Sequence, residues 1–133
     1  MILRNTLKDR VTIEKAFHAT DLQIFGNEGK LHQALLNIIQ NAEQAIGQDG
    51  IIRITTTATD QAMTISIADT GSGIPPEYLK RLGDPFFTTK APGKGTGLGL
   101  SIAYKIIKDH GGKITVQSEV GRGTEFCVTF ARV

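Results

Sequence analysis

The sequence has few of the residues that mark secreted, metal-binding or membrane proteins. Its one cysteine, Cys127, cannot form a disulfide within the chain, and no group of Cys and His has metal-ligand spacing. No apolar run approaches the roughly 20 residues of a membrane helix, and the first ten residues lack the apolar centre of a signal peptide. Fifteen Lys and Arg against thirteen Asp and Glu give a net charge of +2, too small to indicate a nucleic-acid surface. We therefore expect a soluble protein from a reducing compartment, without a nucleic-acid partner or direct membrane contact.

The length of 133 residues suits one domain, so we expect residues 1–133 to form a single, monomeric unit. The composition has one peculiarity, which is fifteen glycines against four prolines. Many of these glycines fall in three clusters, at residues 71–73, 93–99 and 121–123. Because glycine permits backbone conformations and close approaches that side chains block, the clusters suggest several loops around one ligand. Hairpin turns could explain the last cluster alone.

Hydrophobic periodicity predicts strands and helices in an irregular order. The expected strands are Val11–Glu14, Leu22–Phe25, Ile51–Ala58, Ala62–Ala68, Lys113–Glu119 and Thr124–Ala131. The expected helices are Leu31–Ile46 with Asn27 as N-cap, a short helix between Pro75 and Gly83, and about Gly99–His110 with a core face of Leu98, Ile102, Ala103, Ile106 and Ile107. Such mixing favours a sheet with helices on one face over a doubly wound parallel sheet.

The first long helix carries a stripe of amide side chains, Gln33, Asn37, Asn41 and Gln44. These four lie within an arc of about 80° beside the apolar face. Amides can present a neutral oxygen to a hard cation and an N–H group to phosphate. The alternative is an exposed face that happens to be rich in amides.

One predicted strand ends in a carboxylate that shares the phase of its apolar residues. The row Met63, Ile65 and Ile67 leads to Asp69, and a carboxylate there is costly to bury unless a donor reaches it. The following residues, 70–74, turn at two glycines and leave room for a flat ligand with an exocyclic amine, such as adenine. The alternative is an Asx turn, in which Asp69 caps its own backbone.

Glycine recurs at every second position from Gly93 to Gly99, directly before the third helix. Such a run offers unpaired N–H groups and the helix dipole to phosphate oxygens. It is not a P-loop, because GxxxxGK[ST] is absent, and no strand leads into it as in a dinucleotide fingerprint. The pattern therefore predicts a phosphate-binding loop rather than a lid without a ligand.

In order, LHQALLNIIQNA, DTGSGI, DPFFTTK, GKGTGLGL and GRGTEF resemble the N, G1, F, G2 and G3 boxes of the histidine-kinase catalytic and ATP-binding domain, in the GHKL ATPase superfamily. The resemblance covers about residues 22–133, and NAEQA and DPFFTTK are closest to nitrogen-regulation and sporulation-type sensor kinases. It implies an α+β fold, a two-layer α/β sandwich. In this fold, called the GHKL or Bergerat fold, a mixed sheet of about five strands packs on three helices and ATP lies between the helices.

The resemblance also implies roles for individual residues. Asn41 would place its amide oxygen on Mg²⁺, with Asn37 one turn earlier beside the phosphates. Asp69 would accept from the adenine amine, with Thr124 near the same edge. The other positions implied to bind the cofactor are Gly71, Gly73, Ile74, Phe87, Gly95, Thr96, Gly97, Leu98, Gly99 and Leu100. Phe86 and Phe87 would anchor the lid, with core packing as the alternative for Phe86.

Two positions depart from a common form of the family. Many members have a basic residue and an aromatic one where this chain has Gln44 and Ala45. The phosphate charge would then be met by Lys90 and Lys94, although a solvated loop is the alternative for both. With Asn37 and Asn41, these lysines are the candidate catalytic residues.

One position separates kinases from hydrolases within the superfamily. The topoisomerase, mismatch-repair and chaperone members carry a water-activating glutamate one turn before the metal-binding asparagine, where this chain has Asn37, an amide without useful basicity. None of the histidines, His18, His32 and His110, stands in a phospho-acceptor box. The γ-phosphoryl group should therefore wait for a nucleophile from another domain.

Together these features predict the cytoplasmic catalytic domain of a two-component sensor histidine kinase. It would bind Mg-ATP and phosphorylate a histidine on a separate dimerisation domain, from which a response-regulator receiver domain would be served. We do not expect it to phosphorylate itself alone. The alternatives are a serine protein kinase of the anti-sigma-factor type and a GHKL module that senses nucleotide without catalysis.

Overall fold

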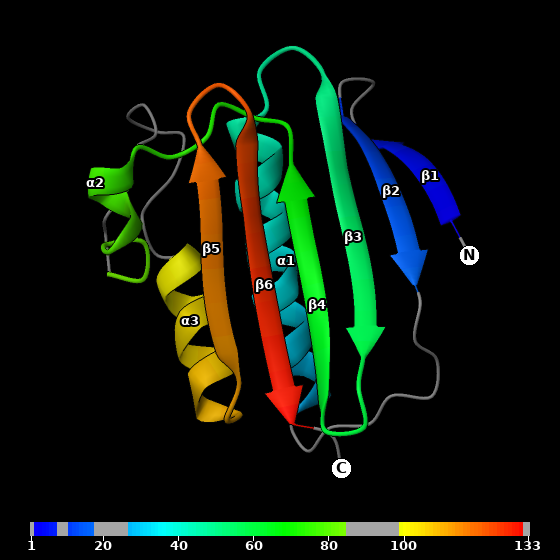
Figure 1. Ribbon diagram of the computed structural model, residues 1–133, viewed down its shortest axis with the longest axis vertical. Helices are drawn as coiled ribbons and strands as arrows, with labels where there is room; N and C mark the ends of the chain where they lie inside the picture. The colour runs from blue at the N-terminus through cyan, green and yellow to red at the C-terminus, as the bar shows by residue number, and fades with distance from the viewer. Residues whose placement is uncertain (1, 8–10, 18–26, 85–98, 132–133) are drawn as a thin grey trace.

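The computed structural model of the protein describes residues 2–7, 11–17, 27–84 and 99–131 (Figure 1). These residues form the strands β1 (Ile2–Leu7), β2 (Val11–Phe17), β3 (Gly50–Ala58), β4 (Ala62–Asp69), β5 (Lys113–Glu119) and β6 (Gly123–Ala131). They also form the helices α1 (Glu28–Ala45), α2 (Pro76–Leu79) and α3 (Gly99–Asp109).

The strands form one six-stranded sheet in the order β1-β2-β3-β4-β6-β5. The pair β2–β3 is parallel and the other neighbouring pairs are antiparallel, so the sheet is mixed. A parallel pair needs a long connection, and here α1 lies between the two strands in the sequence. The helices α1 and α3 lie together on one face of the sheet (Figure 1).

The predicted two-layer α+β sandwich is therefore confirmed. The sheet has six strands rather than about five, because residues 2–7 add the edge strand β1, which pairs with β2. The hairpin β3–β4 and the strands β5 and β6 lie within one residue of their predicted bounds. The predicted strand Leu22–Phe25 falls outside the described residues.

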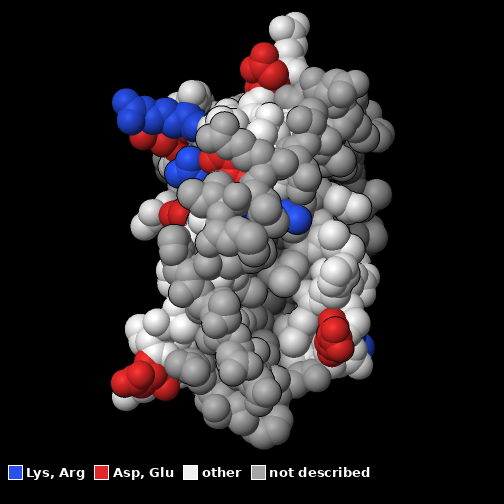
Figure 2. Space-filling model, turned by 90° about the vertical axis from the view of Figure 1, so that its right-hand side faces the viewer, with Lys and Arg blue, Asp and Glu red and all other residues white. Residues whose placement is uncertain are grey.

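Figure 2 shows the molecule from the side of β1, with described acidic and basic side chains in small separate groups.

Helix α1 begins as its sequence predicts. Asn27 has an extended backbone, and its side-chain oxygen accepts a hydrogen bond from the backbone N–H of Lys30 at 3.0 Å, which satisfies one of the free donors of the first turn. Ala34, Ile38 and Ala42 are buried at four-residue spacing, so one face of the helix enters the core.

The predicted core face of α3 is wrong at Ile102, whose side chain is 39% exposed. Ala103, Ile106 and Ile107 are buried as expected, but Leu100 and Tyr104 complete the face. Ile102 lies about 100° around the helix from Ala103, on the side away from Leu100 and Tyr104. Leu98 falls outside the described residues.

The short helix α2 begins at Pro76 and ends at Leu79, within the predicted range, and Leu82 is buried in the turns that follow it. No helix in the described ranges is both long and apolar enough to cross a membrane.

The centre of the core is the antiparallel pair β4–β6. The inward row of β4, which ends at Asp69, lies opposite the inward row of β6, which begins at Thr124. Phe126 and Val128 in this second row have no exposed surface, as the alternation predicts. Each of these side chains contributes about 2–3 kcal/mol of hydrophobic free energy when buried. This packing holds Asp69 and Thr124 side by side at one end of the sheet.

His110 joins the end of α3 to the start of α1. Its ring Nδ1 lies 2.7 Å from the carbonyl oxygen of Ile106, and its Nε2 lies 2.9 Å from the backbone nitrogen of Asn27. A carbonyl only accepts and a backbone N–H only donates, so Nδ1 carries the proton and Nε2 accepts. The imidazole therefore links the two helices. His110 therefore has a structural role at the end of α3.

We expect His110→Ala to lower the free energy of unfolding by about 1 kcal/mol, because two hydrogen bonds are lost and the freed groups can reach water. The control is His32→Ala, which removes an exposed histidine from α1 and should change the free energy by less than about 0.5 kcal/mol. Urea unfolding of the two variants measures the difference. Equal stabilities would contradict the proposed link.

Candidate functional site

Asp69 ends β4 with its carboxyl group inside the molecule, where the residue is only 6% exposed. Its Oδ1 accepts a hydrogen bond from the backbone N–H of Gly71 at 2.8 Å, which is the Asx turn considered above. Its Oδ2 is buried and has no hydrogen-bond partner. Among the described residues, the hydroxyl of Thr56 is the only other buried side-chain polar group without a hydrogen-bond partner. The Asx turn therefore accounts for one oxygen and leaves the other in need of a donor.

The electrostatics of Asp69 reflect this arrangement. Burial raises the pKa of its carboxyl group above the ordinary value of 3.8, because the charged form loses its hydration. The backbone N–H groups of Gly71 and Thr124 oppose this rise. A ligand that donates a hydrogen bond to Oδ2 would satisfy the charged form and offset the cost of burial.

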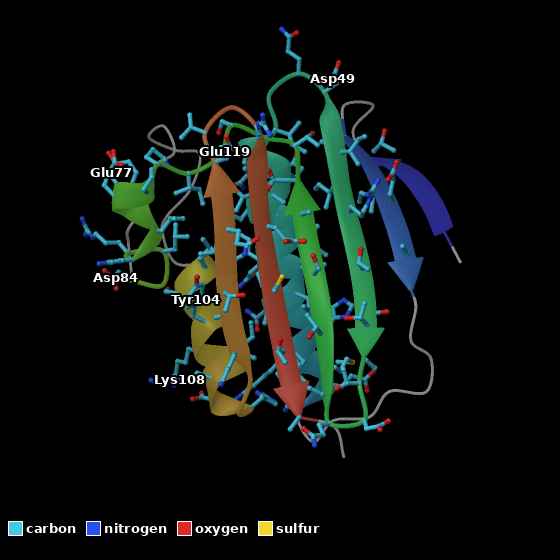
Figure 3. All side chains as sticks on the ribbon, viewed as in Figure 1. Asp49, Glu77, Asp84, Tyr104, Lys108 and Glu119 are labelled. Atoms are coloured by element: carbon cyan, nitrogen blue, oxygen red, sulfur yellow. The ribbon has the colours of Figure 1, made fainter. Side chains whose placement is uncertain are left out.

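The glycines after Asp69 allow the backbone to pack closely against its own protein. A Cβ at Gly71 would lie 2.6 Å from the carbonyl oxygen of Ala45, at the end of α1. A Cβ at Gly73, where φ is +79°, would lie 2.3 Å from the carbonyl oxygen of Glu119. Glu119 is labelled at the end of β5 in Figure 3. Internal packing therefore requires both glycines, whether or not they also approach a nucleotide as predicted.

The same turn is joined to α1 and to the β5–β6 turn by backbone hydrogen bonds. The N–H of Ser72 donates to the carbonyl of Ala45 at 3.1 Å, and the N–H of Gly121 donates to the carbonyl of Ser72 at 2.9 Å. The predicted apolar wall, Ile74, is buried in the core. The G1 and G3 boxes thus form one connected structure at the end of the sheet.

The amide stripe of α1 lies beside this structure. Asn41 precedes Ala45 by about one helical turn, so it lies close to the turn that follows Asp69. Asn41 is half-buried, and its amide has no hydrogen-bond partner within the described ranges. An unpaired amide oxygen there fits the predicted ligand of a hard cation. Gln33 and Gln44, at the other positions of the stripe, are exposed.

Asn37 connects the stripe to α3. Its side-chain Nδ2 donates to the carbonyl oxygen of Gly99, the first residue of α3, at 3.1 Å. A Cβ at Gly99 would meet none of the described residues within 4 Å, and Leu100 packs partly against the core. The structure thus brings Asn37, Gly99 and Leu100 together.

Several predicted site residues fall outside the described residues. They are Phe86, Phe87, Lys90, Lys94, Gly95, Thr96, Gly97 and Leu98.

Sequence reasoning missed Ser118, which completes a polar row across three strands. In the register of the sheet, Ser118 of β5 lies opposite Thr124 of β6, and Thr124 lies opposite Asp69 of β4. The sequence holds a signal for it. The inward row of each of these three strands is apolar except for one polar residue at this end of the sheet. Thr124, predicted near Asp69, is only 4% exposed.

Ser118 makes three hydrogen-bond contacts. Its Oγ lies 2.7 Å from the backbone nitrogen of Ile74, 3.0 Å from the carbonyl oxygen of Gly123 and 2.8 Å from Oγ1 of Thr124. It therefore connects the turn after Asp69 to the start of β6.

Residues 26–133 match the model of one family, described as histidine kinase-, DNA gyrase B-, and HSP90-like ATPase. The chain belongs to this ATPase family. The resemblance read from the five boxes is therefore confirmed.

Two relatives of this ATPase domain are named as kinases. It is 42% identical over 125 residues to sporulation kinase C of Bacillus subtilis (strain 168), covering 93% of this chain and 29% of that protein. It is 42% identical over 116 residues to sensor histidine kinase ZraS of Escherichia coli (strain K12), covering 86% of this chain and 24% of that protein. The chain thus spans less than a third of these relatives.

Solved structures show the same fold. The nucleotide-free catalytic domain of histidine kinase ThkA has a TM-score of 0.78 at 35% identity, covering 92% of this chain and 78% of that chain. Full-length ShkA in complex with AMPPNP has a TM-score of 0.79 at 33% identity, covering 92% of this chain and 26% of that chain.

The close packing of the ATPase domain at Gly73 can be tested against a matched glycine. We expect Gly73→Ala to lower the free energy of unfolding by about 2 kcal/mol more than Gly121→Ala. Both residues have positive φ, so both substitutions strain the backbone, but a Cβ at Gly121 would meet nothing within 4 Å. Chemical denaturation of both variants measures the difference, and equal losses would show that backbone conformation alone requires Gly73.

The buried charge of Asp69 should lower the free energy of unfolding of the nucleotide-free domain. Because folding raises the pKa of Asp69, its ionisation destabilises the folded state progressively as pH rises from 3.8 through the folded pKa. We expect Asp69→Asn to be up to about 1 kcal/mol more stable at pH 7, with this advantage lost below pH 3.8. Thermal unfolding across this pH range, with exposed Asp49→Asn as control, provides the measurement. An Asp69→Asn variant no more stable than wild type at pH 7 would contradict this account.

Proposed function

We propose that this domain binds Mg-ATP and donates the γ-phosphoryl group to a histidine on a separate dimerisation domain, as the catalytic part of a two-component sensor histidine kinase. The observation that carries the proposal is the buried Oδ2 of Asp69, which has no partner and lies beside the turn of the G1 box. The 6-amino group of adenine is a donor that would satisfy this oxygen. The sensor kinases among the relatives support the choice of reaction.

Different residues would contact the base, the metal ion and the phosphates of the nucleotide. Asp69 would hold the adenine amine, with Ile74 as an apolar wall and Thr124 at the same edge of the base. Asn41 would hold Mg²⁺ through its amide oxygen, and the ion when bound supplies positive charge that neutralises the phosphates. The N–H groups before α3 would cradle the phosphates, because a helix N-terminus attracts anions.

The lysines of residues 85–98 would supply further charge, and Phe87 would contact the nucleotide. Lys90 and Lys94 replace the basic residue that the stripe of α1 lacks at Gln44.

Transfer rather than hydrolysis follows from the residue one helical turn before Asn41 on α1, which is Asn37 rather than a glutamate. Asn37 cannot remove a proton from water, and its Nδ2 already donates to the carbonyl of Gly99. The acceptor imidazole nitrogen would form the new bond to the γ-phosphorus while the bond to the β,γ-bridging oxygen breaks and ADP leaves. The phosphohistidine would then serve a response-regulator receiver domain. On this proposal, the domain would act in the cytoplasm as one unit of a longer kinase.

The test mixes this chain with the histidine-containing hairpin domain of the same parent and γ-labelled ATP. We expect acid-labile label on the hairpin histidine, and no label on this chain incubated alone. Label on a serine of another protein would instead support an anti-sigma-factor type of kinase. ATP binding without any transfer would support a nucleotide-sensing module, and either result would overturn the proposal.

A change of charge at Asn41, the proposed metal ligand, provides a second test of the proposed function. We expect Asn41→Asp to reduce transfer by about tenfold or more and to alter its dependence on Mg²⁺, because a charged ligand replaces a neutral one. Gln40→Glu adds the same charge at an exposed position of α1 and should leave transfer within about twofold of wild type. Equal effects of the two variants would reject Asn41 as the metal ligand.

A further inference from the structure

The three contacts of Ser118 determine where the protons of its network lie. The N–H of Ile74 only donates, so it occupies one lone pair of Ser118 Oγ. The carbonyl of Gly123 only accepts, so it takes the single hydroxyl proton of Ser118. Thr124 must then donate its own proton to the second lone pair of Ser118. This assignment fully satisfies the serine hydroxyl and uses the only proton of Thr124.

The assignment explains why Asp69 has an unpaired oxygen next to a hydroxyl group. Thr124 and Asp69 are directly opposite on neighbouring strands and face the same side of the sheet, where Cβ atoms lie about 5 Å apart. A threonine hydroxyl so placed is a natural donor to a buried carboxylate. The hydroxyl instead points to Ser118, and Oδ2 of Asp69 has no partner.

We propose that Ser118 is a positioning residue that keeps the ligand-binding oxygen of Asp69 free by holding the Thr124 hydroxyl away from it. The same bond uses the hydroxyl proton of Thr124 and leaves its two lone pairs free. Thr124 therefore acts only as an acceptor toward the edge of the base. Ser118 thus controls the hydrogen-bonding pattern that selects an amino-substituted purine. This inference rests on the proposed binding of ATP, but its first test needs no nucleotide.

The first test measures the pKa of the Asp69 carboxyl group by carbon NMR in the nucleotide-free protein. In Ser118→Ala, the Thr124 hydroxyl is free to turn and donate to Oδ2, which favours the charged form and should move the pKa down from its raised value. In the Thr124→Val background, Ser118→Ala should leave this pKa unchanged. Ser118→Thr, which keeps a hydroxyl, should restore the wild-type value.

The matched control is Ser66→Ala. Ser66 lies on the opposite face of β4, where its hydroxyl donates to Glu125 at 2.6 Å. This variant should leave the pKa of Asp69 unchanged, although it also removes a serine hydrogen bond from the sheet. An equal effect of both alanine variants would assign the change to general loosening of the sheet and would overturn the proposal.

The second test measures ATP binding by calorimetry. Ser118→Ala should raise the dissociation constant about tenfold, because Asp69 Oδ2 is then satisfied within the protein and the adenine amine must displace Thr124. In the Thr124→Val background the same substitution should change the constant less than about twofold, as a double-mutant cycle requires.

Three further results would overturn the proposal. The first is an unchanged pKa of Asp69 in Ser118→Ala. The second is an equal loss of ATP affinity with and without the Thr124 hydroxyl, which would indicate a purely structural role. The third is a clear further rise of the pKa in Thr124→Val alone, which would show that Thr124 already donates to Asp69. The third readout needs no Ser118 variant, so it applies even if Ser118→Ala fails to fold. Wild-type protein that does not bind ATP would instead reject the proposed function and leave the NMR result to stand by itself.

Discussion

A carboxylate that is half satisfied and almost fully buried is the constraint on which the site depends. Asp69 can be held there only because β4 lies at the centre of the sheet, where Phe126 and Val128 pack opposite its inward row. The Asx turn satisfies one oxygen and fixes the side chain, so the second oxygen has a defined position. The free energy of the core offsets the cost of that oxygen while no ligand is bound.

The surrounding backbone fits this carboxylate closely. The turn after Asp69 is in contact with the end of α1 on one side and with the β5–β6 turn on the other. Arg122 lies in that second turn with an exposed side chain, as a turn residue should. Close packing within the protein therefore requires the glycines of the G1 box. Ser118 adds a side-chain connection between the same segments, and its hydroxyl group is saturated by them.

The sequence predicts those parts of the structure that depend on local pattern. Asn27 caps α1, Asp69 ends a buried row, and β6 alternates as expected, because each outcome needs only helix or strand periodicity. The error at Ile102 has a different origin, since the side of α3 that is buried depends on where α1 and β5 lie. Ser118 was missed because its role appears only once the register of three strands is known.

Hydrogen bonds at both ends of α3 join this helix to α1. The backbone N–H of Asn27, just before α1, donates to His110, and the side chain of Asn37, in the middle of α1, donates to the carbonyl of Gly99, so the two helices run antiparallel. Asn41, proposed to hold the metal, and Gly99, proposed to lie at the phosphates, thus belong to the layer of helices, whereas Asp69 and Thr124 belong to the sheet. In the proposed binding mode, the thickness of the apolar core between the two layers would set the distance between the base and the phosphates of the nucleotide.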